Sequence, residues 1–95
     1  MIHMRTISDL ARPQLAKGVR LQIDSITGKS VLLYPEGILE LNETAHDILS
    51  RCDGRSVAAI VQGLAEQYEA DADALAADVR ETLADVHQRK LIELI

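Results

Sequence analysis

Hydrophobic and polar residues alternate along the first half of the chain in the manner of β-strands. Over residues 19–24, Val, Leu and Ile alternate with Arg, Gln and Asp, which is the period of a strand with one buried face. Two short apolar runs follow at residues 31–34 and 38–41, separated only by the sequence Pro-Glu-Gly. Because proline fixes φ and glycine permits positive φ, these three residues predict a tight hairpin turn. The pattern therefore predicts a three-stranded antiparallel sheet.

Apolar positions in the second half recur every three or four residues, which is the spacing of one helix face. Asn42 is suited to cap a first helix over residues 42–52, and a second helix spans residues 56–68. A third helix follows, which either Asp71 or Asp73 can cap. The predicted buried faces are Ala45, Ile48, Leu49 and Cys52 on the first helix, Val57, Ile60, Val61, Leu64 and Tyr68 on the second, and Leu75, Val79, Leu83 and Val86 on the third.

The order of these elements predicts the α+β class, as a three-stranded antiparallel sheet followed by three helices in a winged-helix-like arrangement. Ninety-five residues are enough for one domain. Residues 1–18 lack a clear period and carry a net positive charge, so we interpret them as a basic N-terminal arm and residues 19–95 as the domain. The apolar residues 91–95 either dock on the helices or add a short strand.

The composition is unusual in its aromatic content. Two Tyr and no Phe or Trp predict an aliphatic core. Cys52 is the only cysteine and cannot form an internal disulfide, which suits a reducing compartment. No apolar run approaches the roughly 20 residues needed to cross a bilayer, and the first ten residues lack the apolar segment of a secretory signal. We therefore expect a cytoplasmic protein without a membrane partner.

Charge is distributed unevenly along the chain. Residues 1–30 carry five Lys or Arg and two Asp, whereas residues 31–95 carry five basic and thirteen acidic side chains, a net charge of −8. Nucleic-acid affinity rests largely on cationic side chains that neutralise phosphates. The predicted second helix, residues 56–68, contains no Lys or Arg that would surround a DNA-reading helix. A winged-helix nucleic-acid-binding protein therefore remains the less favoured alternative, and we expect no nucleic-acid partner.

Candidate catalytic and metal-ligating residues are few and scattered. His3, His46 and His87 lie on the arm and on two different helices, whereas a metal site needs three or four convergent ligands. Cys52 belongs to an apolar helix face, where it is expected to be core and not a nucleophile. Ser25, in the sequence Asp-Ser-Ile, resembles the phosphopantetheine attachment site of carrier proteins, but it follows a strand and precedes a turn instead of opening a helix. We expect no catalytic residue, no metal and no cofactor.

A peptide-binding groove is the site that the predicted fold favours. An exposed strand edge beside a helix can accept an extended peptide, whose backbone bonds to the edge and whose side chains enter apolar pockets. The last predicted strand supplies such an edge, and the third helix supplies a second wall if it packs beside that strand. The candidate contacts are Ile38, Leu39, Glu40 and Leu41 on the strand, Asp78 and Thr82 on the helix flank, and Val79 and Leu83 behind them.

Several short sequences occur along the chain in a distinctive order and spacing. They are Leu-Tyr-Pro-Glu-Gly at residues 33–37, Leu-Asn-Glu-Thr-Ala at 41–45, Ile-Leu at 48–49 and Cys-Asp-Gly at 52–54, followed by Val57, Ile60, Val61, Leu64, Tyr68, Asp78 and Val79. In this order they closely resemble the PqqD family of pyrroloquinoline quinone (PQQ) biosynthesis. The resemblance covers about residues 12–92, which is nearly the whole chain.

The resemblance implies a winged-helix-like peptide chaperone without catalytic activity, of the kind called a recognition element for ribosomally made, post-translationally modified peptides (RiPPs). Such a protein binds a precursor peptide like PqqA and presents it to a radical SAM enzyme like PqqE, which cross-links a Glu and a Tyr of the peptide. The leader is taken as an added strand between the third strand and the third helix. Binding is carried by the resemblance onto Ile38, Leu39, Glu40, Leu41, Asp78, Val79, Thr82 and Leu83. The oligomeric state stays open, including a homodimer formed by exchange of a strand or of the arm.

Overall fold

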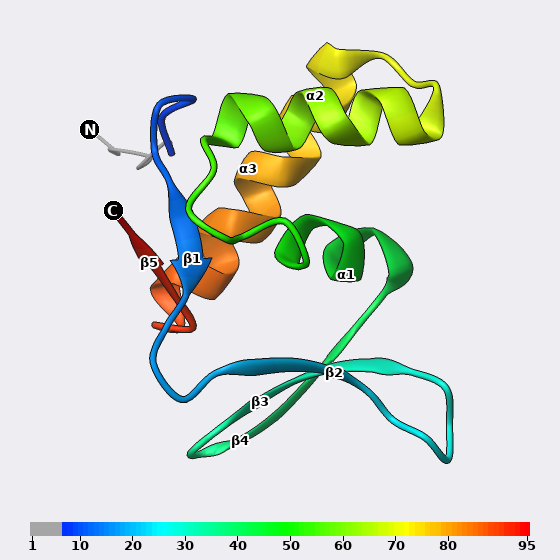
Figure 1. The fold of residues 1–95 in the computed structure, drawn as a ribbon, viewed down its shortest axis with the longest axis vertical. Helices are drawn as coiled ribbons and strands as arrows, with labels where there is room; N and C mark the ends of the chain where they lie inside the picture. The colour runs from blue at the N-terminus through cyan, green and yellow to red at the C-terminus, as the bar shows by residue number, and fades with distance from the viewer. Residues whose placement is uncertain (1–6) are drawn as a thin grey trace, which may run out of the picture.

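The computed structural model describes residues 7–95 (Figure 1). Its strands are β1 (Pro13–Leu15), β2 (Arg20–Ile23), β3 (Ser30–Tyr34), β4 (Gly37–Leu41) and β5 (Ile92–Leu94), and its helices are α1 (Glu43–Leu49), α2 (Val57–Tyr68) and α3 (Ala72–Gln88). In Figure 1 the helices lie above the sheet of β2, β3 and β4, while β1 and β5 lie side by side at one flank. The predicted α+β class, with a winged-helix-like order of sheet and helices, is confirmed.

β2, β3 and β4 form an antiparallel sheet in which β3 is central. Tyr34 pairs with Gly37 across a two-residue turn, so the hairpin predicted from Pro-Glu-Gly is confirmed. Leu32 lies opposite Leu21 on one side and Leu39 on the other, and its side chain is wholly buried. The face that carries these three leucines is apolar, and α1 contacts β3 and β4. β2 and β4 are the two edges of this sheet.

Each helix begins where a polar side chain caps its first turn. Oδ1 of Asn42 accepts a hydrogen bond from the N–H of Ala45 at 2.7 Å, and Ser56 and Asp71 cap α2 and α3 in the same manner. Asn42 is the predicted cap, Ser56 stands where the second helix was predicted to begin, and Asp71 is one of the two caps that the sequence allows for the third helix. α1 ends at Leu49, three residues earlier than predicted, because the following turn is tightened by hydrogen bonds that span three residues instead of four.

The predicted place of Tyr68 on the buried face of α2 is wrong. Its side chain is 37% exposed, and its hydroxyl donates a hydrogen bond to the carboxylate of Asp47 on α1. A phenol is apolar along the ring but needs a hydrogen-bond partner at its tip. At the last residue of α2 that partner lies at the surface, so the ring stays partly exposed and does not enter the core.

β1 and β5 form a second, two-stranded sheet that joins the two ends of the described chain. They pair antiparallel, with Gln14 opposite Glu93 and Leu15 opposite Ile92. Leu91 and Ile92 are buried, so the C-terminal tail is held against the body where residues 13–15 pass. Of the two outcomes expected for the tail, the structure has the short strand.

The expected arm of residues 1–18 differs from the structure where the structure describes it. Strand β1 was not predicted, because three residues are too few to show a period and Pro13 removes a backbone donor. Ile7 is also buried against the core. Residues 1–6, with His3, lie outside the described residues, so the division of the chain into arm and domain stays an expectation.

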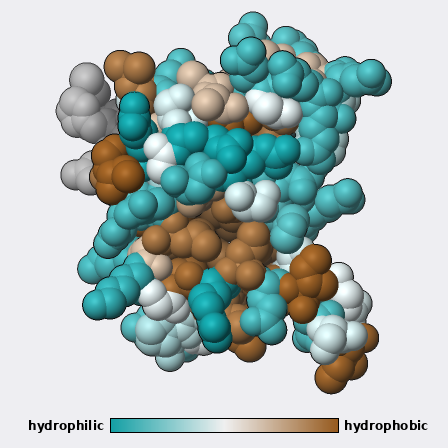
Figure 2. All heavy atoms as spheres, viewed as in Figure 1, coloured by the Kyte–Doolittle hydropathy of each residue, from teal (hydrophilic) through white to brown (hydrophobic). Residues whose placement is uncertain are grey.

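The core is formed by α1, α2, α3 and the apolar face of β3. Its most completely buried side chains are Leu32, Ile48, Leu49, Val57, Ile60, Leu64, Val79 and Leu83. No Phe, Trp or Tyr is among the buried residues, so the predicted aliphatic core is confirmed. Figure 2 shows apolar residues also gathered in the hollow between the helices and the sheet. Within residues 7–95, no helix is long and apolar enough to span a bilayer.

Candidate functional site

A groove of about 750 Å³ lies between β4 and α3, and the start of α1 lines it as well. The condition set by the sequence, that the third helix lies beside the last strand of the sheet, is therefore met. The strand contributes Leu39, Glu40 and Leu41, α1 and its cap contribute Asn42, Thr44 and Ala45, and α3 contributes Asp78, Glu81, Thr82, Ala84, Asp85, Val86 and Gln88.

The backbone of β4 offers hydrogen-bonding groups towards this groove. Tyr34 and Gly37 close a two-residue hairpin, so this pair exchanges its hydrogen bonds within the sheet, and every second pair along the ladder does the same. The N–H and C=O groups of Leu39 consequently point to β3. Those of Ile38 and Glu40 point away from it. Among residues 7–95, β4 pairs with no other strand, so these outward groups form an open edge.

Side chains of β4 alternate between the two faces of the sheet. Leu39 and Leu41 are half-buried and belong to the face that carries Leu32. Ile38 and Glu40 belong to the opposite face, where Ile38 is 65% exposed and Glu40 forms an ion pair with a lysine at 3.0 Å. An added strand would thus meet two leucines on its inner side and solvent on its outer side.

The four residues predicted on α3 fall into two groups, one at the groove surface and one in the core. Asp78 and Thr82 line the groove, Asp78 exposed and Thr82 half-buried. Val79 and Leu83 have no exposed surface and belong to the core. They support the wall from behind and do not reach the groove surface. Five of the eight predicted residues therefore line the groove: Leu39, Glu40, Leu41, Asp78 and Thr82. The three that do not are Val79, Leu83 and Ile38, which lies on the outer face of the edge strand.

Two acidic residues of the wall, Glu81 and Asp85, were not predicted as groove residues. Glu81 and Asp85 follow Asp78 at three and seven residues, which puts all three carboxylates on one stripe of α3. Their spacing from Asp78 was a usable signal, because residues three and seven positions apart share one face of a helix. Three carboxylates thus line the α3 wall, and no Lys or Arg lines the groove. Glu40 borders the groove through its place on the edge strand, but its side chain lies on the outer face of the sheet.

Cys52 is the only cysteine, and its thiol is free and buried, as predicted for a core residue. Burial raises the pKa of the thiol to about 12, with the neighbouring carboxylate of Asp53 adding to the rise. A thiol with so high a pKa holds its proton at neutral pH and is a poor nucleophile. Within residues 7–95, no three His, Cys, Asp or Glu side chains are grouped as a metal ion would require.

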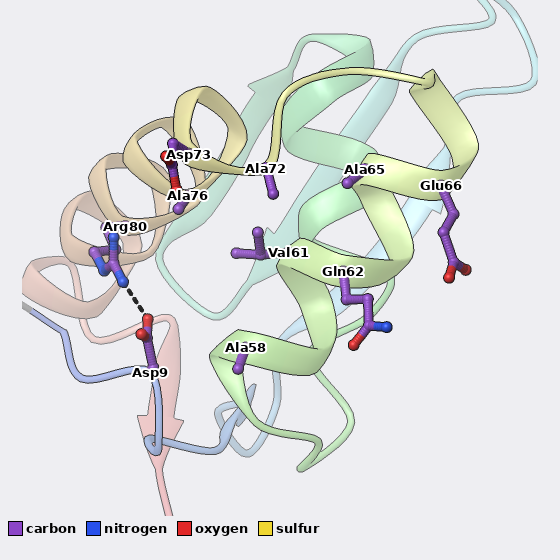
Figure 3. A pocket seen from close by; sticks show the side chains of 10 residues that line it. All are labelled: Asp9, Ala58, Val61, Gln62, Ala65, Glu66, Ala72, Asp73, Ala76 and Arg80. Atoms are coloured by element: carbon purple, nitrogen blue, oxygen red, sulfur yellow. Dashed lines mark hydrogen bonds and ion pairs between the residues drawn. The ribbon is translucent and has the colours of Figure 1, made fainter.

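A second hollow of about 670 Å³ lies between α2 and α3, on a different face of α3 from the first groove (Figure 3). Small side chains such as Ala58, Ala65 and Ala76 line it, and an ion pair between Asp9 and Arg80 bounds one end. None of the residues predicted to bind peptide lines this hollow. Of the two hollows, only the β4–α3 groove borders the open strand edge.

The fold and the groove define a class of protein: a small winged-helix-like α+β domain with an open sheet edge beside a helix, the geometry by which an extended peptide can be added as a strand. Within that class the chain belongs to the PqqD family. The model of that family, described as Coenzyme PQQ synthesis protein D (PqqD), matches residues 29–92.

Relatives and solved structures agree with this assignment. The chain is 44% identical over 92 residues to the PqqA binding protein of Xanthomonas oryzae pv. oryzae strain PXO99A, which covers 96% of this chain and all of that protein. It is similar to the solution NMR structure of the PqqD truncation of Methylobacterium extorquens PqqCD, a functional and stand-alone RiPP recognition element. That match has a TM-score of 0.79 and 36% identity and covers 92% of this chain and 94% of that one. The crystal structure of PqqD from Xanthomonas campestris matches with a TM-score of 0.60 and 42% identity, over 94% and 100% of the two chains.

Proposed function

We propose that this protein binds a PqqA-type precursor peptide by adding it as a strand to β4, and presents it to a modifying enzyme. The open edge of β4 facing α3 is the observation that carries this proposal. The names of its relatives, PqqA binding proteins, and of its structural neighbour, a RiPP recognition element, support it. The acidic lining of the groove gives no support to the alternative of a nucleic-acid partner.

Each predicted residue has a distinct role in this proposal. Ile38 and Glu40 bond the peptide through their backbone N–H and C=O groups. Leu39 and Leu41 receive its inward side chains. Asp78 and Thr82 form the opposing wall, whose position depends on two wholly buried residues behind it, Val79 and Leu83.

The mechanism is positioning without bond chemistry. Two edge residues supply two donors and two acceptors, each hydrogen bond contributing about 0.5–1.5 kcal/mol net. A peptide held as a strand has already lost part of its conformational freedom when it meets the enzyme, so less entropy is lost at that encounter. We propose that the protein is not itself an enzyme, and that its partner is a radical SAM enzyme like PqqE that cross-links a Glu and a Tyr of the peptide.

Two further expectations stay proposals. We place the protein in the cytoplasm, where its free, buried Cys52 stays reduced. A homodimer would form if the pairing of β1 with β5, made here within one chain, were made between two copies. Light scattering at two concentrations a hundredfold apart tests the dimer, and a monomer mass at both would count against it.

The test of the proposed function is an NMR titration of the isotope-labelled protein with the synthetic PqqA peptide of Xanthomonas campestris. We expect saturable amide shifts at Ile38 and Glu40 and on the Asp78–Thr82 flank of α3. The amides of β2, on the far edge of the sheet, serve as the internal control and should move least. Saturable shifts confined to β2 or α2 would show that the peptide binds elsewhere, and no shift at hundreds of micromolar peptide would refute binding by this chain alone.

A further inference from the structure

We propose that the β4–α3 groove selects peptides that carry Lys or Arg on the side of the added strand that faces α3. This inference rests on the proposed function and specifies the chemistry of its ligand. The family relationship and the open edge explain how a peptide backbone is held, but backbone pairing is blind to sequence. Selection must therefore come from the side chains that line the groove.

The charge of the groove has one sign. Asp78, Glu81 and Asp85 lie on one stripe of α3, and no cationic side chain is in the lining. Like charges three and four residues apart on a helix repel one another and lower helix stability by a few tenths of a kcal/mol. Asp78 and Glu81 are three residues apart, and Glu81 and Asp85 are four apart. The stripe therefore carries an electrostatic cost that a cation in the groove would relieve.

Internal ion pairs neutralise only part of this charge. Asp85 pairs with Arg89 at 3.2 Å, and Glu40 pairs with Lys29 at 3.0 Å on the outer face of the sheet. Within the part of the chain that the structure describes, Asp78 and Glu81 have no ion-pair partner. The nearest arginine along α3 to both, Arg80, is directed to Asp9 at the second hollow (Figure 3). Two carboxylates are thus left to meet a ligand.

The alternation of a bound strand places every second side chain against these carboxylates. Residues level with Leu39 and Leu41 would point to the inner face, towards α3, and the residues between them would point to solvent. Lys and Arg suit the inner positions because their methylene stems can lie along the two leucines while their charged ends reach Asp78 and Glu81. An acidic side chain at the same position would meet carboxylates of its own sign.

The experiment is a guest scan on one host peptide. Synthetic PqqA of Xanthomonas campestris, fluorescently labelled, is prepared with Lys or Glu as a guest at each position in turn, and its Kd is measured by anisotropy at low ionic strength. Three proteins are compared: the wild type, Asp78→Asn/Glu81→Gln, and the matched control Glu66→Gln/Glu93→Gln. The control changes net charge equally, at exposed residues of α2 and β5 outside the groove. Circular dichroism checks that all three fold.

With the wild type we expect positions two residues apart at which Lys binds about 3- to 10-fold more tightly than Glu, the scale of exposed ion pairs at low salt. The preference should shrink to less than about 2-fold in Asp78→Asn/Glu81→Gln and persist in the control. Binding with equal affinity for both guests, or an equal preference in all three proteins, would overturn charge selection and leave strand addition standing. No binding of any peptide would overturn both proposals.

Discussion

Ile38 and Ile23 lie on the two free edges of the three-stranded sheet, with their side chains on opposite faces. Their side chains are 65% and 54% exposed. The alternation that turns the backbone groups of Ile38 away from β3 does the same for Ile23 when it is carried across the ladder to β2. Only the edge of β4 borders the groove. The outward backbone groups of the two isoleucines therefore form a matched pair for testing strand addition.

We expect Ile38→Pro to weaken binding of the PqqA peptide at least about 10-fold, because proline removes one edge donor and its ring projects where the peptide strand would lie. Ile23→Pro makes the same change on the opposite edge and should leave Kd within about 2-fold. Titration calorimetry measures both. Equal weakening by the two variants would contradict the assignment of β4 as the receiving edge. Leu39→Pro is a poorer test, since the N–H of Leu39 lies within the sheet ladder and its loss would disrupt the fold.

The residues of the groove show what a sequence pattern can predict at this scale. The alternation of a strand puts Leu39 and Leu41 on one face, and the structure has them there. Helical spacing correctly put Val79 and Leu83 on a buried face, but whether a buried residue also touches a ligand depends on the depth of packing, and both are wholly covered. Glu81 was missed because an acidic residue on a helix looks the same in sequence whether it faces bulk solvent or a groove.

Cys52 makes the stability of the protein depend on pH in the alkaline range. Burial raises the pKa of its thiol from 9.0 to about 12. The unfolded state therefore loses this proton first as pH rises, so the stability contribution is complete below pH 9 and is lost progressively between 9 and 12. We expect the free energy of unfolding to fall by about 1–2 kcal/mol more in the wild type than in Cys52→Ala between about pH 8 and pH 10.5. Urea titrations of both proteins at the two pH values measure the difference, and parallel losses would argue that the thiol is accessible.

At the scale of elements, length decides what the sequence reveals. β2 to β4, α2 and α3 each extend over enough residues to show a period, and all five were predicted. β1 and β5 have three residues each and pair across almost the full length of the chain. β1 was therefore not predicted, and β5 was predicted only as one of two outcomes for the apolar tail. The ends of α1 are a mixed case: its cap was predicted from Asn42, but its last turn depends on how the following residues pack.

Ile92 on β5 pairs with Leu15 on β1 and is 2% exposed. We expect Ile92→Ala to lower the free energy of unfolding by about 2–5 kcal/mol and to speed hydrogen exchange of the Ala16 amide, which donates to Leu91 at 2.9 Å. Ile95→Ala, at a residue that is 64% exposed, is the matched control and should cost less than about 0.5 kcal/mol. Unchanged exchange at Ala16 in a destabilised Ile92→Ala protein would separate β5 from β1.

For the whole molecule, the α+β class and the order of sheet and helices could be predicted, because the strands and helices concerned show their period in the local sequence. The position of α3 beside β4 could only be assumed, since it depends on how the three helices pack over the sheet. That packing converts a strand edge, which in isolation is an aggregation hazard, into one wall of a groove. The proposed function thus rests on a tertiary arrangement that the sequence made plausible without fixing it.

A ligand that binds only the folded protein raises its stability by mass action, whichever residues it touches. At a peptide concentration 100 times Kd the gain is about 2.7 kcal/mol, which corresponds to a rise in Tm of about 10 °C or more for a domain of this size. We expect the PqqA peptide to produce such a rise and double-stranded DNA at low salt to produce none, because the molecule carries a net charge of −5 and its groove is lined by carboxylates. Differential scanning fluorimetry measures both.

The same melting experiment on Ile38→Pro tests whether the rise in Tm depends on the edge of β4. If the peptide stabilises the wild type through the edge of β4, the rise in Tm should largely disappear in Ile38→Pro and persist in Ile23→Pro. A rise retained in both variants would keep a peptide-binding protein but remove β4 as its site. A rise produced by DNA instead would favour the nucleic-acid-binding alternative, and it would have to arise on a surface other than the acidic groove.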